Sequence, residues 1–218
     1  MDICARRKLC FPFQARPGVT CGELNLMAVS MQNLDSTRHM GQSTTAFRVA
    51  NESDISKTVD LIESAYRGEI SCKGWTTEAH LLDGQRTDIQ EISELVQDSS
   101  ARLVLAQSGN ELLGCVLVRD EVNYAYIGML AIRPDCQARG LGRQLLEEAE
   151  RCARSEFSAI KSRMTVIVQR KELISWYERR GYCKTGEREP FPYGNPRFGL
   201  PRRPDLEFIV LAKSLLDL

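Results

Sequence analysis

The sequence has 218 residues, with 29 lysines and arginines balanced by 29 aspartates and glutamates, so its formal net charge is zero. This length allows one well-filled domain plus an extension. The balanced charge gives no electrostatic reason to expect a nucleic acid or an anionic membrane as a partner. No apolar run approaches the roughly 18 to 20 residues that cross a bilayer, so we predict no membrane-spanning segment.

The cysteines and histidines argue against a metal site and against a disulfide framework. The sequence contains eight cysteines and two histidines, and no two cysteines have the C-x-x-C spacing of a zinc site. We therefore predict no bound metal. The even number of cysteines would allow disulfides, but Cys115 falls in a strand pattern and Cys152 on the apolar stripe of a helix, where buried free thiols are common. These features predict a reduced, intracellular chain in the cytoplasm.

Residues 1–44 show no sustained hydrophobic period and are mildly basic. Such a leader could be an organelle transit peptide, which would be amphipathic, rich in arginine and poor in acids. The acidic Asp2 and the weak amphipathicity of the segment argue against this alternative. We predict a flexible N-terminal extension over residues 1–44 and a folded domain over residues 45–218.

The hydrophobic pattern sharpens after the extension. Residues 46–50 predict a short strand, and Asn51 or Ser53 can cap the helix predicted over residues 55–66. A second helix is predicted over residues 89–97. The segment between these helices is too polar and too rich in glycine to be a core element, and a loop of that length is usually functional or disordered.

Three strand patterns follow the second helix. Residues 101–107 and 111–119 predict a hairpin around the turn at 108–110. Residues 120–123 turn into the run at 124–132, which is rich in aromatic and aliphatic residues and fits a strand buried over most of its length. We therefore expect antiparallel strands in this part of the chain.

A glycine-containing turn joins this last strand to a helix. Residues 133–135 end the strand, and apolar residues recur at helical spacing after the turn. Gly140 and Gly142 lie where the helix begins, where backbone amides lack partners and the peptide dipoles place partial positive charge. Arg139 and Arg143 could contact the same anion. The turn could bind a diphosphate, or it could be a plain turn into a helix.

The sequence after this helix narrows the choice of ligand. Residues 163–169 predict a short strand, and residues 171–180 predict a helix that ends at Gly181. Residues 187–204 predict a loop before a last strand over 205–213. Neither the P-loop motif nor the dinucleotide-binding fingerprint occurs in the sequence, so the usual nucleotide sites are excluded.

Two motifs in this order resemble those of a known family. A Q-x-x-G-x-G turn follows the strand, and residues 176–182 read W-Y-E-R-R-G-Y. Together they are similar to the GNAT superfamily of acyl-CoA-dependent N-acyltransferases, over residues 45–218. The resemblance implies an α/β fold of the α+β type, with a central mixed, mostly antiparallel sheet of six to seven strands flanked by about four helices.

The resemblance also implies acetyl-CoA as the acyl donor and assigns residues to it. The backbone of Leu130, Ala131 and Ile132 would pair with the pantetheine arm like an added strand, and an amide there would stabilise the oxyanion. The diphosphate would rest on the turn formed by Gln137, Ala138, Arg139, Gly140, Leu141, Gly142 and Arg143.

Tyr177 occupies the position of the family's Y-x-x-x-G-[FY] tyrosine, which protonates the departing thiolate. A phenol has a pKa of about 10 and stays protonated at neutral pH, so it acts as an acid only if it is held close to the thiolate. The alternative is that Trp176 and Tyr177 pack into the core through their rings. Gln169 stands where many relatives have asparagine, so we assign it no contact with the cofactor.

In the family, the segment corresponding to residues 68–88 commonly forms one wall of the acceptor site. Trp75, Glu78 and Arg86 are the candidates for that wall, and Arg86 could hold a carboxylate of the acceptor. The alternatives are that Trp75 plugs the loop against the core and that Arg86 is a surface charge.

The loop predicted over residues 187–204 offers a second candidate wall. Its aromatic residues could shape an acceptor pocket or stack on the adenine of the cofactor, or they could cover the edge of the sheet. We favour one of the two binding roles for the aromatic residues and a structural role in a proline-stiffened connection for the arginines. The residues concerned are Phe191, Tyr193 and Phe198, with Arg188, Arg197, Arg202 and Arg203.

The sequence does not identify the base that takes a proton from the attacking amine. Glu78 or His80 could serve from the first loop, as could an ordered water. Asp120 and Glu121 sit on a hairpin turn that could face the site or point away from it.

We therefore predict acetyl transfer from acetyl-CoA to the primary amine of a small molecule, by direct attack in a ternary complex. The alternatives are a protein acetyltransferase acting on lysines or N-termini, and a module that binds acyl-CoA without turnover. We expect neither a nucleic acid nor a membrane as partner, and the exposed edges of such a sheet could pair into a homodimer. Neither the acceptor amine nor the acyl-chain preference can be read from these residues.

Overall fold

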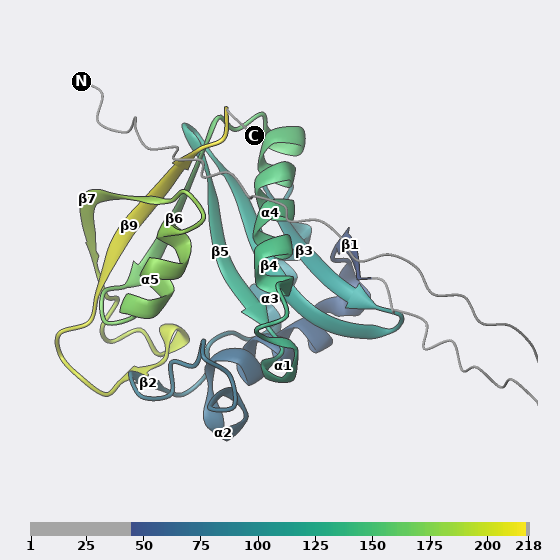
Figure 1. Cartoon of the computed structure of the whole chain (residues 1–218). Coiled ribbons are helices and arrows are strands. Elements are labelled where there is room, and N and C mark those ends of the chain that lie inside the picture. Colours follow the sequence, from purple (N-terminus) through teal and green to yellow (C-terminus); the bar gives the residue numbers. More distant parts are fainter. Residues whose placement is uncertain (1–44, 217–218) are drawn as a thin grey trace, which may run out of the picture. The chain divides into compact units, whose positions relative to one another are not determined.

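The computed structural model describes residues 45–216, so the extension predicted over 1–44 lies outside the described residues. The strands of the main sheet are β1 (Ala46–Val49), β3 (Ala101–Ser108), β4 (Glu111–Glu121), β5 (Tyr124–Ile132), β6 (Lys161–Ile167), β7 (Cys183–Pro190) and β9 (Glu207–Ser214). In this part of the chain they form one seven-stranded sheet in the order β1-β3-β4-β5-β6-β9-β7 (Figure 1). Neighbouring strands are antiparallel except β5 and β6. The predicted mixed, mostly antiparallel sheet is confirmed.

Helices and short strands complete the described residues. The α-helices are α1 (Ile55–Tyr66), α2 (Gly68–Ser71), α3 (Ile89–Gln97), α4 (Leu141–Phe157) and α5 (Lys171–Glu178), and the 3-10 turns are η1 (Glu52–Asp54), η2 (Pro134–Cys136) and η3 (Pro196–Phe198). A small second sheet pairs β2 (Leu82–Asp83) with β8 (Leu200–Pro201). Asn51 caps η1, because its side chain accepts a hydrogen bond from the backbone amide of Ser53 at 2.9 Å.

Side chains of the central strands alternate between two hydrophobic cores, one on each face of the sheet. In β3, Leu103 and Leu105 face the core that contains Ile62 of α1, whereas Val104 faces the core that contains Leu145 of α4. Figure 1 shows α4 on one face and α1 and α3 on the other. Because both faces are covered, these strands read as nearly continuous apolar runs in the sequence.

Strands β5 and β6 run side by side for a short distance and then separate. Their pairing is limited to Ala125 with Ser162 and Tyr126 with Arg163. Beyond Tyr126, β5 stays paired with β4, and β6 stays paired with β9. The sheet therefore opens between β5 and β6, and the opening is visible in Figure 1.

A β-bulge lies in β5 beside this opening. Cys115 pairs with Ala131 and Leu117 with Gly128, so β5 holds one more residue than β4 over this interval. Met129 lies in the bulge and has a φ of 49°, which is uncommon for a residue other than glycine. A bulge bends its strand and leaves the extra residue out of the hydrogen-bond ladder, so it changes the direction of β5 where the sheet opens.

The structure corrects the predicted elements at several strand ends and in one whole strand. β4 continues to Glu121, through the start of the predicted turn, and β6 ends at Ile167, so Gln169 lies beyond it. The prediction of a loop from residue 187 is wrong at its start, because β7 extends to Pro190. All residues of β7 are exposed, so the strand lacks the alternation of apolar and polar residues by which strands are recognised.

The cysteines of the described residues are free. Cys115, Cys136 and Cys152 are buried, and Cys72 and Cys183 are exposed. Burial raises the pKa of the Cys115 thiol to about 12, which keeps it protonated and unreactive. A reduced chain in the cytoplasm stays a prediction.

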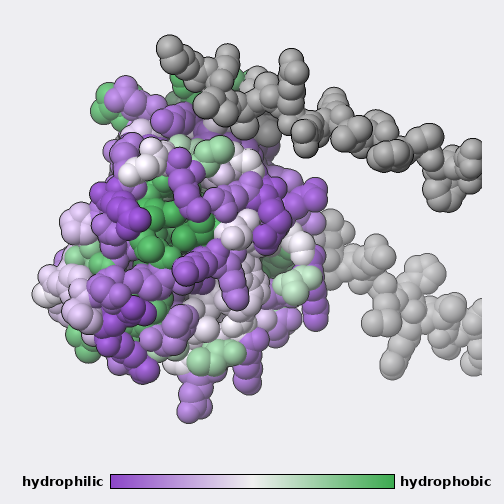
Figure 2. All heavy atoms as spheres, turned by 60° about the vertical axis from the view of Figure 1, so that its left-hand side comes forward, coloured by the Kyte–Doolittle hydropathy of each residue, from purple (hydrophilic) through white to green (hydrophobic). Residues whose placement is uncertain are grey.

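The surface that Figure 2 brings forward carries an apolar patch. Figure 2 shows this patch bordered by hydrophilic side chains. Separately, none of the helices within residues 45–216 has the length and apolar character needed to span a bilayer.

Candidate active site

Two hollows meet in the opening between β5 and β6. The larger has a volume of about 350 Å³ and is bounded by β5 beyond Tyr126, by β6 and by the loops that follow α1 and β7. The smaller, of about 220 Å³, is bounded by the turn before α4 and by α5. The described residues that line both are Tyr66, Leu130, Arg170, Leu173 and Tyr177. Molecules bound in the two hollows could therefore meet at these residues.

Backbone atoms of the turn before α4 form part of the wall of the smaller hollow. Ala138 and Gly140 have positive φ values of 62° and 83°, a conformation that glycine adopts without strain. Within the described chain, no backbone amide of residues 138–142 donates to a backbone carbonyl. These amides open a helix of 17 residues, whose dipole adds partial positive charge. The turn is therefore suited to bind an anion.

Cationic side chains surround the same turn. Arg143 lines the smaller hollow and also pairs with Glu147 at 2.9 Å. Arg180 lines it too, and its guanidinium carbon lies 3.4 Å from the ring centre of Trp176. Burial and the neighbouring arginines lower the pKa of Arg180, so an anion bound here would stabilise its charged form. Arg139 is exposed and does not line the hollow.

Gln137 connects the loop after α2 to the end of β5. Its Oε1 accepts a hydrogen bond from the backbone amide of Trp75 at 2.9 Å. Its Nε2 donates to Thr76 Oγ1 at 2.9 Å and to the carbonyl of Ile132 at 3.0 Å. A Cβ on Gly74 would lie 2.7 Å from Oε1, so a larger residue there would make the amide group of Gln137 shift. The Gln137 side chain therefore fixes the wall of the smaller hollow.

Tyr177 packs in the core and also lines both hollows. Its ring is buried and lies edge-on to Trp176 and Tyr182, with ring centres 5.0 and 5.8 Å away. Its hydroxyl makes no hydrogen bond to another described residue. Burial raises the pKa of Tyr177 well above the ordinary phenol value, because a buried phenolate is poorly solvated. The residue can therefore offer a proton at neutral pH.

Tyr66, at the end of α1, holds the bulged part of β5. Its hydroxyl donates to the carbonyl of Leu130 at 2.7 Å. Burial raises the pKa of Tyr66 to about 12, so the phenol remains a donor at neutral pH. Since both residues line both hollows, this hydrogen bond fixes the backbone where the hollows meet.

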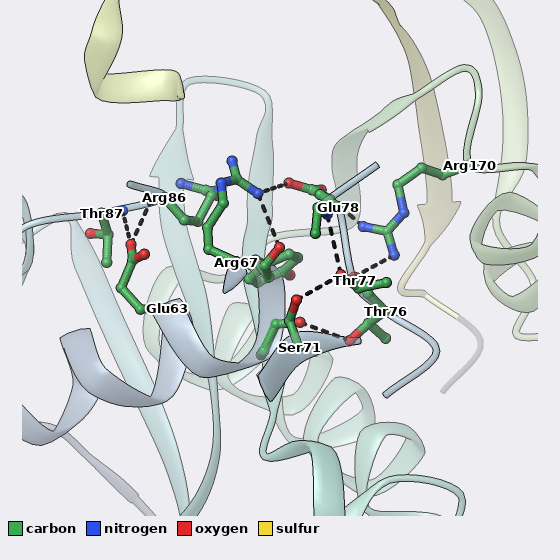
Figure 3. Close-up of polar contacts among 12 residues, drawn as sticks. Glu63, Arg67, Ser71, Thr76, Thr77, Glu78, Arg86, Thr87 and Arg170 are labelled. Atoms are coloured by element: carbon green, nitrogen blue, oxygen red, sulfur yellow. Dashed lines mark hydrogen bonds and ion pairs between the residues drawn. The ribbon is translucent and has the colours of Figure 1, made fainter. Parts of the chain in front are cut away.

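A buried ion-pair cluster forms one side of the larger hollow. Figure 3 shows Glu78 between Arg67 and Arg170. The Glu78 carboxylate pairs with Arg67 at 2.8 Å through Oε2 and with Arg170 at 2.9 Å through Oε1. Burial alone would raise the pKa of Glu78, but the charges of Arg170 and Arg67 outweigh it and the pKa is lowered. Glu78 is therefore a weak proton acceptor.

Arg86 also lines the larger hollow, but its guanidinium group has no such partner. Its backbone amide donates to Glu63 Oε1 at 2.5 Å, which fixes the position of the residue. Its guanidinium carbon lies 5.6 Å from the ring centre of Tyr66. No hydrogen bond or ion pair joins the guanidinium group to another residue of the described chain. It is a cation available to a ligand.

The site combines two hollows joined at a bulged strand, a turn with backbone amides at residues 138–142 that are unpaired within the described chain, and a buried tyrosine. This geometry agrees with the family match. The model of the acetyltransferase (GNAT) family matches residues 62–182. The chain belongs to the GNAT acetyltransferase family. Members of this family use acetyl-CoA as co-substrate and act on amine acceptors.

Solved GNAT structures share this fold. A spermidine/spermine N-acetyltransferase from Vibrio cholerae is 14% identical, with a TM-score of 0.56 over 79% of this chain and 94% of that one. The ribosomal-protein-S18-alanine N-acetyltransferase of Escherichia coli is 15% identical, with a TM-score of 0.56 over 79% of this chain and 94% of that one. A GNAT-family acetyltransferase from Streptococcus pneumoniae is 15% identical, with a TM-score of 0.57 over 78% of this chain and 99% of that one. No curated protein sequence gives a match. Such low identities show the fold alone, and the predicted GNAT fold is confirmed.

The structure separates the residues predicted for the acceptor wall of this GNAT chain. Glu78 and Arg86 line the larger hollow. Trp75 lines the smaller one, beside the free amides, with its ring centre 6.1 Å from that of Trp176. Trp75 is 40% exposed, so its ring is only partly buried against the rest of the chain. Of the residues predicted to contact the cofactor, Ala131 and Leu141 have buried side chains and line neither hollow.

The candidate bases other than Glu78 lie away from the joined hollows. His80 is exposed and lines neither hollow. Asp120 and Glu121 lie at the end of β4 that pairs with Tyr124, whereas the hollows meet at Leu130 near the opposite end of β5. Their separation along the strand spans six residues, or roughly 20 Å. Neither residue lines either hollow.

The segment after β7 contributes aromatic side chains to the larger hollow and uses its arginines elsewhere. Phe191 and Phe198 line the hollow, and Phe191 stacks on Phe208 with ring centres 5.5 Å apart. The hydroxyl of Tyr193 donates to a backbone carbonyl within the loop. The arginines all form ion pairs, in the combinations Arg188 with Glu207, Arg197 with Asp88, Arg202 with Asp83 and Arg203 with Asp205.

Several lining residues escape the sequence patterns. Arg67 directly follows a helix and Arg170 directly precedes one. A charged residue at the end of a helix is normally expected to be exposed to solvent. Tyr66 completes the apolar stripe of α1 and looks like a core residue. Gln169 donates from Nε2 to the carbonyl of Asp205 at 2.7 Å, so it supports the C-terminal loop. Only the long-range contacts of these residues reveal their positions.

Proposed function

We propose that this GNAT chain transfers an acetyl group from acetyl-CoA to the primary amine of a small molecule, by direct attack in a ternary complex. The observation that carries the proposal is the meeting of two hollows at Leu130 and Tyr177. One hollow would hold the acyl donor and the other the acceptor amine. A single connected site lets the amine reach the thioester without a covalent enzyme intermediate.

The smaller hollow fits the diphosphate part of acetyl-CoA. The amides of residues 138–142 have no backbone acceptor within the described chain, and a helix begins there, so they would hold the phosphates. Arg143 and Arg180 would add charge-assisted contacts. The backbone of residues 130–132 would hold the pantetheine arm next to the bulge and would supply an oxyanion donor, which is worth about 2.7 to 4 kcal/mol in related chemistry.

Tyr177 would supply the proton that the reaction needs at sulfur. The neutral amine forms a C–N bond to the thioester carbon while the C–S bond breaks. The thiolate takes the Tyr177 proton, and the nitrogen releases its extra proton to water. The raised pKa of Tyr177 keeps the phenol protonated before each turnover, so its position rather than its acidity would make it effective.

A small acceptor fits the larger hollow better than a protein segment does. Strands β2 and β8 pair Leu82 with Pro201 and Asp83 with Leu200, and Arg202 pairs with Asp83 at 2.5 Å. These contacts join the loop after α2 to the loop after β7. Both loops border the hollow, so they would restrict the access of a folded protein chain.

Replacing Tyr177 by phenylalanine tests the proposal. Thiol release from acetyl-CoA, measured with a panel of amines, amino acids, polyamines and peptides, should fall at least about tenfold in kcat for the best acceptor. Calorimetry should give nearly the same affinity for coenzyme A, because the phenol makes no hydrogen bond to the turn of residues 138–142 and the ring that packs in the core is retained.

Tyr124→Phe is the matched control. Tyr124 begins β5 and lines neither hollow, so the loss of its hydroxyl should leave kcat unchanged. Unchanged turnover in the Tyr177 variant would remove the acid role. No heat with either coenzyme A or acetyl-CoA in the wild-type chain would refute the proposed function.

A further inference from the structure

The larger hollow is lined by more cationic than anionic side chains. Among the described residues these are Arg67, Arg86 and Arg170 against Glu78 and Glu189. Glu189 is exposed on the edge strand β7. Glu78, Arg67 and Arg170 are buried, each with 7 to 8% of its surface exposed, and Arg86 is half-buried. The inner wall therefore holds one carboxylate and three guanidinium groups.

The one carboxylate on the inner wall, that of Glu78, already has ion-pair partners. One oxygen of Glu78 pairs with Arg67 and the other with Arg170, so two guanidinium groups already balance its charge and it offers an ammonium group little net attraction. A ligand with several positive charges would bring them toward a wall that is already cationic. An acceptor of that kind is disfavoured by like-charge repulsion.

Arg86 has hydrogen-bonding capacity to spare. The carboxylates on the neighbouring helices act elsewhere: Glu63 accepts the backbone amides of Arg86 and Thr87 at 2.5 and 2.8 Å, and Glu91 accepts the Thr87 hydroxyl at 2.8 Å. In addition, Nε and Nη2 of buried Arg67 have no hydrogen-bond partner in the described part of the chain. A planar guanidinium group without a partner is suited to bidentate binding of a carboxylate.

We propose that the acceptor carries a carboxylate in addition to its amine, and that Arg86 binds this carboxylate. The inference rests on the proposed function and names its substrate class. Arg86 lies over Tyr66, a residue of both hollows, so a bound carboxylate would hold the amine on the acceptor side of their junction. Phe191 and Phe208 also line the larger hollow, so an acceptor with an apolar body would fill it. The class is therefore amino acids and related amino carboxylic acids with an apolar side chain.

Matched acceptors that differ in the carboxylate test the proposal. Thiol release is measured with L-phenylalanine, L-phenylalaninamide and 2-phenylethylamine, and with spermidine as a polycation. We expect kcat/KM for L-phenylalanine to exceed that for its amide by at least about tenfold, which is the usual effect of one charge-assisted hydrogen bond pair. Spermidine should be the poorest acceptor.

A binding measurement without turnover separates this inference from the proposed function. The chain saturated with coenzyme A is titrated by calorimetry with 3-phenylpropionate, which has the carboxylate but no amine, and with 3-phenylpropanol, which has neither. Heat is expected with the acid alone. Arg86→Gln should lose this heat and the preference for L-phenylalanine, whereas Arg86→Lys should keep part of both because it retains the charge.

Arg151→Gln controls for the loss of a positive charge, since Arg151 is exposed on α4 and pairs with Glu148. It should bind and turn over like the wild type. Circular dichroism verifies that each variant is folded. Equal rates with L-phenylalanine and its amide, heat with the alcohol, or unchanged binding in folded Arg86→Gln would overturn the carboxylate site. If coenzyme A and the acid bind but no amine is acetylated, the proposed function fails and the carboxylate site stands.

Discussion

Tyr177 combines a structural role with the proposed acid role at a single position. Its ring packs against Trp176 and Tyr182, so the backbone and ring are held rigidly. Its hydroxyl lacks a partner among residues 45–216, so the polar end remains available to a ligand. An acid that works through position needs this combination, because a rigid ring places the proton and an unpaired hydroxyl can donate it.

The pKa of Tyr177 predicts the alkaline part of the pH profile. Burial raises this pKa above its ordinary value of about 10, so the phenol should keep its proton through pH 9.5. We expect kcat for thiol release to show no alkaline decline between pH 7 and 9.5. A decline with a midpoint below pH 9 that disappears in Tyr177→Phe would mean that the phenol loses its proton in this range, contrary to the prediction.

At the scale of elements, the turn before α4 depends on one glycine conformation. Gly140 has a φ of 83°, and a Cβ placed there would meet no atom within 4 Å. Any cost of a side chain at this position is therefore conformational rather than steric. Since the neighbouring amides form the proposed anion site, a change in the backbone of Gly140 should affect coenzyme A binding directly.

Gly140→Ala should weaken coenzyme A binding. The left-handed conformation costs an L-residue about 1 to 2 kcal/mol, so the turn should relax and move its amides. We expect at least a fivefold increase in the Kd measured by calorimetry, or about 1 kcal/mol.

Gly109→Ala is a control with the same kind of strain at a distant turn. Gly109 has a φ of 57° with no atom within 4 Å of its Cβ position, and it lies between β3 and β4. Both variants should lose similar thermal stability, but only Gly140→Ala should lose affinity. Equal Kd values for the two would mean that the turn does not hold the phosphates.

At the scale of the whole molecule, one ion-pair cluster links parts of the chain on both sides of the sheet opening. Arg67 follows α1, Glu78 lies in the loop after α2, and Arg170 lies between β6 and α5. Arg170 also donates to the carbonyl of Thr76 at 2.8 Å. The cluster therefore connects the half of the molecule built on β5 to the half built on β6.

Glu78→Gln should destabilise the fold by about 3 to 5 kcal/mol, because it leaves buried guanidinium groups without a counter-charge. Urea unfolding monitored by tryptophan fluorescence measures the loss. Glu187→Gln is the control: Glu187 pairs with Arg163 at 2.7 Å on the exposed surface, and its loss should cost less than about 1 kcal/mol. Equal losses in the two variants would contradict a structural role for the cluster.

The same cluster predicts an acid-dependent contribution to stability. The pKa of Glu78 is lowered in the folded chain, so its contribution is present above the unfolded pKa of about 4.3 and is lost as the pH falls through the folded value. The stability difference between wild type and Glu78→Gln should therefore be constant from pH 7 to 5 and shrink below about pH 4. A difference that stays constant in acid would show that the carboxylate charge does not produce it.

Local sequence patterns determined the helices, most strands and the turn proposed to bind the diphosphate. The apolar spacing of α1, α3 and α4 and the glycines at 140 and 142 act within a few residues, so they can be read without knowing the fold. The exposed strand β7 could not be found this way, because its residues gain their hydrogen bonds from β9 rather than from a pattern of their own.

The acceptor side of the site was decided by the tertiary structure. Arg67, Glu78 and Arg170 are far apart in the sequence, and their pairing depends on the separation of β5 from β6. Whether Arg86 is a surface charge or a cation facing a hollow depends on which carboxylates the fold brings near it. Charges interact through space over several ångströms. The partners of a charged residue therefore depend on how the chain folds, and a local sequence pattern does not predict them.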